Sequence, residues 1–194
     1  MRKIEIKVEQ QKNTSSDINE HINTLYQYAK DCSHITEMGV RWVSSTWPLI
    51  YSNPKKMISY DVIRDNNIDE VIELAKEYNI DYEFIQNDVL NITIEPTELL
   101  FIDTLHTYNQ LFLELKKHSE NVSKYIILHD TNTFGNVDES IYNHASDIVK
   151  SISSEKSGLV SAVNDFLQTD NGKKWSIKEI FTNNNGLTIL KRVS

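Results

Sequence analysis

Short apolar segments recur along the chain, and a polar residue or a turn follows each of them. Their length and composition are typical of β-strands, and residues 125–128 (Tyr-Ile-Ile-Leu) suit a strand covered on both faces. We predict strands over residues 33–39, 56–60, 82–86, 98–102 and 125–128.

Apolar residues at helical spacing separate these strands. Ile18, Ile22 and Leu25 recur at intervals of three and four behind Ser16, a residue type that commonly caps helices. The same kind of spacing returns between the later strands. We predict helices over residues 17–29, 68–78, 107–122 and 158–167, and a turn followed by a helix over residues 44–51.

Three further segments complete the pattern. Residues 175–182 and 187–192 read as strands of a hairpin, because the Asn185-Gly186 pair between them supplies the positive φ of a tight turn. Residues 134–156 are polar and poorly periodic, so we expect a long excursion with at most one irregular helix. Residues 1–15 predict a polar tail or an edge strand, or an arm in a homo-oligomer.

Alternating strands and helices indicate right-handed crossovers and a parallel sheet, which the terminal hairpin joins in antiparallel orientation. We therefore predict an α/β fold with a doubly wound, mostly parallel sheet of about seven strands. The domain spans residues 16–194 and follows the polar segment 1–15.

The composition narrows the functional classes. The 194 residues are 39% hydrophobic and 25% charged, which is typical of a globular protein. A net charge of −8 disfavours a nucleic-acid partner. Cys32 is the only cysteine, which excludes an intrachain disulfide and favours a reducing compartment. Without a signal-like start or a membrane-length apolar run, we expect a soluble, cytoplasmic protein with no membrane partner.

Acidic residues stand at the ends of the predicted parallel strands, where ligands bind in such sheets. A turn-forming or helix-capping role explains any one of them equally well. The residues are Glu37, Asp61, Asp88, Asp103 and Asp130, the last preceded by His129.

No glycine-rich phosphate loop accompanies these carboxylates. The chain has five glycines and neither the GxxxxGK[ST] nor the GxGxxG pattern, which argues against a nucleoside triphosphate and against a dinucleotide. A nucleoside ligand without phosphates fits better, with its ribose hydroxyls held by the carboxylate after the second strand.

Several segments together resemble the class I S-adenosylmethionine-dependent methyltransferases, which have a Rossmann-like fold. The most specific are residues 101–108 (Phe-Ile-Asp-Thr-Leu-His-Thr-Tyr) and 129–131 (His-Asp-Thr), with residues 37–46 as a weaker match. The likeness spans residue 30 to the C-terminus and is greatest to the branch with macrocin O-methyltransferase and the cephalosporin hydroxylase-like proteins. Trp42 and Ser44 stand where most members carry a second or third glycine.

The resemblance implies roles for individual residues. Glu37, Gly39 and Ser44 would lie at the loop that holds the methionine part of S-adenosylmethionine. Asp61 would bind the ribose hydroxyls, Asp88 would lie beside the adenine amino group, and Asp103 near the sulfonium.

The resemblance also implies O-methyl transfer to a sugar or another small polyol. Asp103 and Asp130 would hold a divalent cation, Mg²⁺ or Mn²⁺, while His106 or His129 completes the site or acts as the base. Imidazole ligands would shift the preference towards later metals. The other histidines have no partner pattern, and we expect structural roles for His21, His34, His118 and His144.

Two other functions compete with this interpretation. The glycine-poor first loop is compatible with a cofactor-binding relative that no longer methylates and serves as a scaffold or in other chemistry. A nicotinamide-dependent oxidoreductase on a similar fold is disfavoured, because the GxGxxG pattern is missing.

Overall fold

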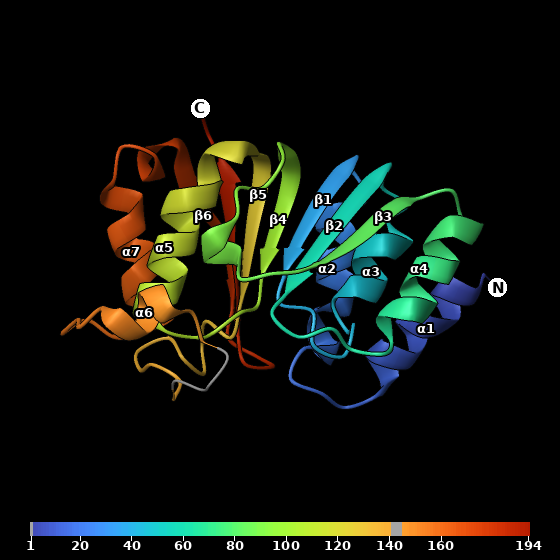
Figure 1. Cartoon of the computed structure of the whole chain (residues 1–194), viewed down its shortest axis with the longest axis horizontal. Coiled ribbons are helices and arrows are strands. Elements are labelled where there is room, and N and C mark those ends of the chain that lie inside the picture. Colours follow the sequence, from blue (N-terminus) through green and yellow to red (C-terminus); the bar gives the residue numbers. More distant parts are fainter. Residues whose placement is uncertain (1, 141–144) are drawn as a thin grey trace.

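The protein is described by a computed structural model that covers residues 2–140 and 145–194. This part of the chain contains a seven-stranded sheet in the order β3-β2-β1-β4-β5-β7-β6 (Figure 1). The strands are β1 (His34–Met38), β2 (Lys56–Asp61), β3 (Asp81–Gln86), β4 (Thr97–Ile102), β5 (Val122–His129), β6 (Trp175–Phe181) and β7 (Leu187–Arg192).

Strands β1 to β5 run parallel, whereas β7 pairs antiparallel with both β5 and β6. The predicted doubly wound α/β sheet with a C-terminal antiparallel hairpin is therefore confirmed. The order of the strands in the sheet reverses between β1 and β4. At such a switch point the loops that follow the two strands diverge and leave a crevice.

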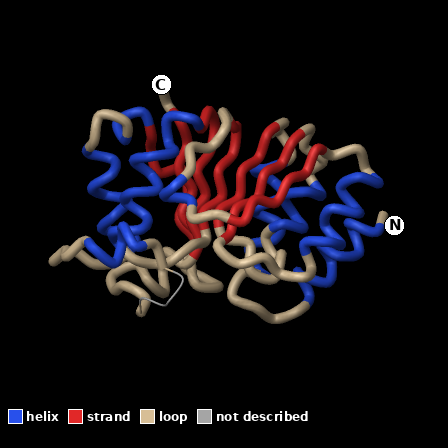
Figure 2. The backbone as a smooth tube through the Cα atoms, viewed as in Figure 1, coloured by secondary structure: helices blue, strands red, loops and turns tan. Residues whose placement is uncertain are grey.

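Helices cover both faces of the sheet, as Figure 2 shows with the sheet between them. Within each strand, alternate side chains point to opposite faces: Leu99 and Phe101 join the core under the N-terminal helices, while Leu100 and Ile102 join the core under α5 and α7. The helices are α1 (Lys3–Asn13), α2 (Ile22–Ala29), α3 (Thr46–Tyr51), α4 (Ile68–Glu77), α5 (Tyr108–His118), α6 (Asp147–Ser151) and α7 (Leu159–Gln168).

The N-terminal segment is a helix, which corrects our prediction of a polar tail or an edge strand. Ile4 and Val8 lie one helical turn apart on α1 and are 2% and 6% exposed in the core next to α3. Lys3 and Lys7 form ion pairs with Glu77 and Glu70 of α4. The sequence misled because Ile4, Ile6 and Val8 also fit the period of two of a strand.

Other differences concern element boundaries. The predicted helix 17–29 begins as a short 3₁₀ turn, Asn19–His21, and continues as α2. Helix α5 ends at His118, so that β5 begins at Val122, earlier than predicted. The excursion after β5 contains α6, and His144 lies outside the described residues.

The register of the sheet brings the ends of the parallel strands together. Met38 pairs with Tyr60 of β2 and with Ile102 of β4, and Ile102 in turn pairs with Leu128 of β5. The residues that follow these positions therefore share the carboxyl edge of the sheet. Among the described helices, none has the length and apolar content that a membrane span requires.

Candidate active site

A cavity of about 590 Å³ opens at this carboxyl edge. Of the residues that the sequence singled out, Gly39, Asp61, Asp88, Asp103 and His106 line it. Glu37, Ser44, His129 and Asp130 lie outside the lining.

The first loop, between β1 and α3, has an unusual backbone. Gly39, Arg41 and Val43 all have positive φ, at 82°, 47° and 61°. Positive φ is uncommon for any residue other than glycine and strained for a β-branched one. Arg41 and Val43 thus adopt the left-handed backbone that favours glycine, whereas Trp42 and Ser44 do not.

Gly39 is the position where this loop most requires glycine. A side-chain carbon there would overlap the carbonyl of Asp103 in the adjacent β4 loop. The close approach packs the loops after β1 and β4 against each other, so both reach the cavity.

Asp61 ties the first loop to the end of β2. Its Oδ2 accepts hydrogen bonds from the backbone N–H groups of Val40 (2.8 Å) and Arg41 (3.1 Å), and Oδ1 accepts one from Ile63 N–H (3.0 Å). A carboxylate has about four acceptor positions, so Asp61 keeps capacity for a hydroxyl of a ligand. Asp88 similarly caps the turn after β3, since Oδ1 accepts from Leu90 N–H (2.9 Å).

Glu37 lies outside the cavity lining, and its contact with a cofactor stays a prediction. Its carboxyl group is fully buried and accepts hydrogen bonds from Ser45 Oγ (2.6 Å), Thr46 Oγ1 (2.9 Å) and Ser59 Oγ (2.7 Å). Burial raises the pKa of Glu37 to about 7, although the three hydroxyl donors oppose the rise. Glu37 therefore connects β1 to β2 and to the start of α3, while Ser44 is only half-buried beside these donors.

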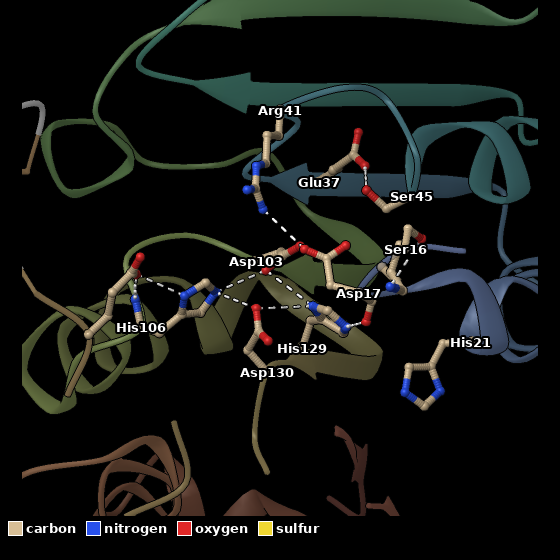
Figure 3. A network of polar contacts seen from close by, with 12 residues as sticks. Ser16, Asp17, His21, Glu37, Arg41, Ser45, Asp103, His106, His129 and Asp130 are labelled. Atoms are coloured by element: carbon tan, nitrogen blue, oxygen red, sulfur yellow. Dashed lines mark hydrogen bonds and ion pairs between the residues drawn. The ribbon is translucent and has the colours of Figure 1, made fainter. Parts of the chain in front are cut away.

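Two carboxylates and two imidazoles form a compact cluster (Figure 3), and two of these residues, Asp103 and His106, line the cavity. His106 Nε2 lies 3.0 Å from Asp103 Oδ1 and 3.0 Å from Asp130 Oδ2. His129 Nδ1 lies 3.4 Å and 3.3 Å from the same two oxygens, without the alignment of a hydrogen bond. The four groups come from the ends of β4 and β5 and from the loop after β4.

Opposite charges stabilise one another in this cluster. Burial disfavours the charged form of Asp103 and by itself would raise its pKa. The positive charge of His129 and the hydrogen bond from His106 outweigh this effect and hold the pKa of Asp103 well below its usual range. Likewise, burial lowers the pKa of His106, yet its contacts with Asp103, Asp130 and Glu139 raise it to about 12. The pKa of His129 rises to about 10, because Asp103 and Asp130 overcome the same burial effect.

Asp103, His129 and Asp130 fit a divalent cation. Each offers one ligand atom, and these atoms lie within 4.8 Å of one another. His129 Nε2 contacts the carbonyl oxygen of Asp17 (3.1 Å), so it carries hydrogen, and Nδ1 faces the two carboxylates. Among the described residues, His129 Nδ1 and Asp130 Oδ1 are buried without a hydrogen-bond partner.

The two histidines differ in access to the cavity. The His106 side chain is 13% exposed and lines the cavity, whereas that of His129 is 1% exposed. His106 Nδ1 contacts Glu139 Oε2 (2.9 Å), and Phe134 stacks on the ring with centroids 4.9 Å apart. Sequence reasoning missed Glu139 and Phe134, because they lie in the excursion after β5, where periodicity offers no signal.

Comparison with solved structures shows the fold of S-adenosylmethionine-dependent methyltransferases. The S-adenosylhomocysteine-bound methyltransferase PaMTH1 of Podospora anserina matches with a TM-score of 0.60 and 13% identity, over 97% of this chain and 87% of that one. A Staphylococcus aureus protein provisionally assigned as a caffeoyl-CoA O-methyltransferase matches with a TM-score of 0.60 and 13% identity, over 98% of both chains.

The same fold occurs in a nucleic-acid-modifying enzyme. The 16S rRNA methylase RmtB matches with a TM-score of 0.55 and 13% identity over 91% of this chain, which spans 63% of the RmtB chain. No protein-family model and no curated protein matches the sequence. The fold is therefore established, and the acceptor has to be inferred from the site.

Proposed function

We propose that this protein is an S-adenosylmethionine-dependent O-methyltransferase that acts on a hydroxyl group of a sugar or another small polyol. The observation that carries the proposal is one cavity whose wall includes Asp61 and Asp88 together with Asp103 and His106, the latter two in contact with each other and His106 with Asp130. Within the fold, the motifs of residues 101–108 and 129–131 favour the branch with macrocin O-methyltransferase.

The cavity suits the cofactor in its charge and in its hydrogen-bond acceptors. Asp61 keeps acceptor capacity for the vicinal ribose hydroxyls, and Asp88 for the adenine amine. A sulfonium cation is attracted by the carboxylates of the lining, with Asp103 the proposed neighbour of the sulfur.

Asp103, Asp130 and His129 would hold the divalent cation. Their mixed oxygen and nitrogen donors suit Mn²⁺ or a later metal at least as well as Mg²⁺. Such a cation, when bound, lowers the pKa of an acceptor hydroxyl and fixes its direction.

His106 is the residue proposed to take the hydroxyl proton. The His106 side chain lines the cavity. Its Nε2 lies 3.0 Å from both Asp103 and Asp130, and its Nδ1 contacts Glu139. His106 can act as a base only when another positive charge offsets Asp103 and Asp130, because these carboxylates otherwise keep it protonated.

The charge of the lining favours a neutral acceptor. Arg41 and His106 face five carboxylates in the cavity wall, so a phosphorylated acceptor or a nucleic acid would be repelled. The carboxylates are Asp61, Asp65, Asp88, Asp103 and Glu139.

A cofactor-binding relative without transferase activity is the second candidate, and the first loop favours it. Left-handed backbone at Arg41 and Val43 costs about 1 kcal/mol per residue, which glycine would avoid. Such a loop can weaken cofactor binding or change its pose.

Titration calorimetry with S-adenosylmethionine and S-adenosylhomocysteine, with and without MnCl₂ or MgCl₂, tests the proposal first. We expect micromolar binding of both, followed by release of S-adenosylhomocysteine with at least one member of a panel of sugars and polyols. Binding without turnover across the panel would favour the second candidate. Absence of binding under all conditions would refute both.

A further inference from the structure

Glu114 is a buried carboxyl group that the proposed reaction does not use. It lies on α5, four residues after Gln110, and is fully buried. Its Oε1 accepts one hydrogen bond from Thr104 Oγ1 (2.7 Å) and another from Gln110 Nε2 (2.6 Å). Thr104 and Gln110 both line the cavity, so Glu114 lies directly behind its wall.

This carboxyl group determines what its two neighbours can offer a ligand. Oε1 is an acceptor, so the Thr104 hydroxyl and the Gln110 amide nitrogen both donate to it. Thr104 thereby uses its single hydroxyl hydrogen and keeps only lone pairs. Gln110 turns its nitrogen towards Glu114, which leaves its amide oxygen for the cavity side.

A third acceptor and apolar side chains belong to the same part of the wall. Asp88 and Val89 both line the cavity, and the turn Val89–Asn91 contacts α5. Burial raises the pKa of Glu114 to about 7, although the hydrogen bonds from Gln110 and Thr104 oppose the rise. Val89, Leu105 and Ala145 provide apolar lining, and Leu105 and Ala145 belong to one small apolar cluster. Apolar side chains together with hydrogen-bond acceptors fit a flat heterocycle that presents a hydrogen-bond donor.

We propose that Gln110 and Thr104, oriented by Glu114, select the exocyclic amine of the cofactor's adenine. This inference rests on the proposed function, since it takes S-adenosylmethionine as the ligand. The amine donates two hydrogen bonds, and the oxygens of Gln110 and Thr104 can accept them because Glu114 takes the hydrogens of both side chains. A 6-oxo purine would instead direct a carbonyl oxygen at the oxygens of Gln110 and Thr104, which offer it no hydrogen.

The inference can be tested by binding alone, without knowledge of the acceptor. S-adenosylhomocysteine and S-inosylhomocysteine differ at two adjoining positions of the purine: a carbonyl replaces the amine, and N1 carries a hydrogen. By titration calorimetry we expect the wild-type protein to bind the adenosyl compound roughly 100-fold more tightly. Gln110→Leu and Thr104→Val should each reduce this ratio about tenfold, because each removes one acceptor.

Two control variants separate selectivity from general damage. Asp61→Ala should weaken both compounds by the same factor, because both carry the same ribose. Thr182→Val repeats the threonine substitution at an exposed position outside the lining and should leave the ratio unchanged. Thr104→Val preserves the side-chain shape and carries the test if Gln110→Leu fails to fold.

The outcomes distinguish this inference from the function on which it rests. A wild-type protein that binds both compounds equally, or variants that keep the wild-type ratio, would overturn the inference and leave the proposed function intact. A wild-type protein that binds neither compound would overturn both.

Discussion

Replacing Glu37 by Gln should remove a specific part of the pH dependence of stability. The Glu37 carboxyl group is fully buried among three hydroxyl donors, and burial raises its pKa from 4.5 to about 7. Gln keeps the size and one acceptor oxygen but cannot ionise. The variant thus separates the charge of the side chain from its hydrogen bonds.

The direction of this pH dependence follows from the number of protons that the folded and unfolded chains bind. Between pH 4.5 and about 7 the unfolded chain has lost the Glu37 proton while the folded chain keeps it, so the free energy of unfolding falls as pH rises. A slope of about 1.4 kcal/mol per pH unit over this interval gives a loss of about 3 kcal/mol in the wild-type protein. The contribution is fully present below pH 4.5 and lost as pH passes the folded pKa.

Urea unfolding of both proteins from pH 4.5 to 8 measures the effect. We expect Glu37→Gln to be less stable than wild type at pH 4.5, by about 1 kcal/mol for an altered hydrogen-bond network, and more stable at pH 8. The difference between the two proteins isolates Glu37, because other titrating groups are common to both. A difference that stays constant across this range would refute the reasoning.

Three further predictions concern separate parts of the molecule. Asp61→Ala should weaken S-adenosylhomocysteine binding at least about tenfold in calorimetry, because the carboxylate holds the first loop and is the proposed ribose acceptor. His129→Ala should weaken Mn²⁺ binding, measured by electron paramagnetic resonance, about tenfold or more, whereas equal affinity would exclude the imidazole as a ligand. Ile4→Ala should lower the free energy of unfolding by about 2 to 4 kcal/mol, while the exposed Ile6→Ala on the same helix should change it by less than about 0.5 kcal/mol; similar losses would contradict the packing of α1.

Much of the fold could be predicted because its signals are local. Strand segments such as 98–102 are short and apolar between turns, and Asn185-Gly186 marks the hairpin. Parallel strands end at one edge of a sheet, so Gly39, Asp61 and Asp103 could be expected near one another before any contact was known. Helix α1 was not predicted, because Ile4, Ile6 and Val8 fit the period of two of a strand, while Ile4 and Val8 also fit the spacing of a helix.

The roles of individual site residues depend on contacts distant in sequence. Glu37 and Asp61 both stand at strand ends, yet Glu37 is enclosed by hydroxyl groups from α3 and β2, while Asp61 lines the cavity. His106 and His129 look equally suitable in the sequence. They differ because Glu139 and Phe134 hold His106 at the cavity, whereas the carbonyl of Asp17 holds His129 in the interior.

The sequence by itself determined the sheet, its terminal hairpin and the edge where chemistry-bearing residues gather, because hydrophobic period and turn chemistry act between near neighbours. Only the tertiary structure decided which carboxyl groups are enclosed, which histidine meets the cavity and which way Gln110 faces. Burial and hydrogen-bond direction are set by partners from other elements, as Glu114 shows by orienting Thr104 from ten residues away.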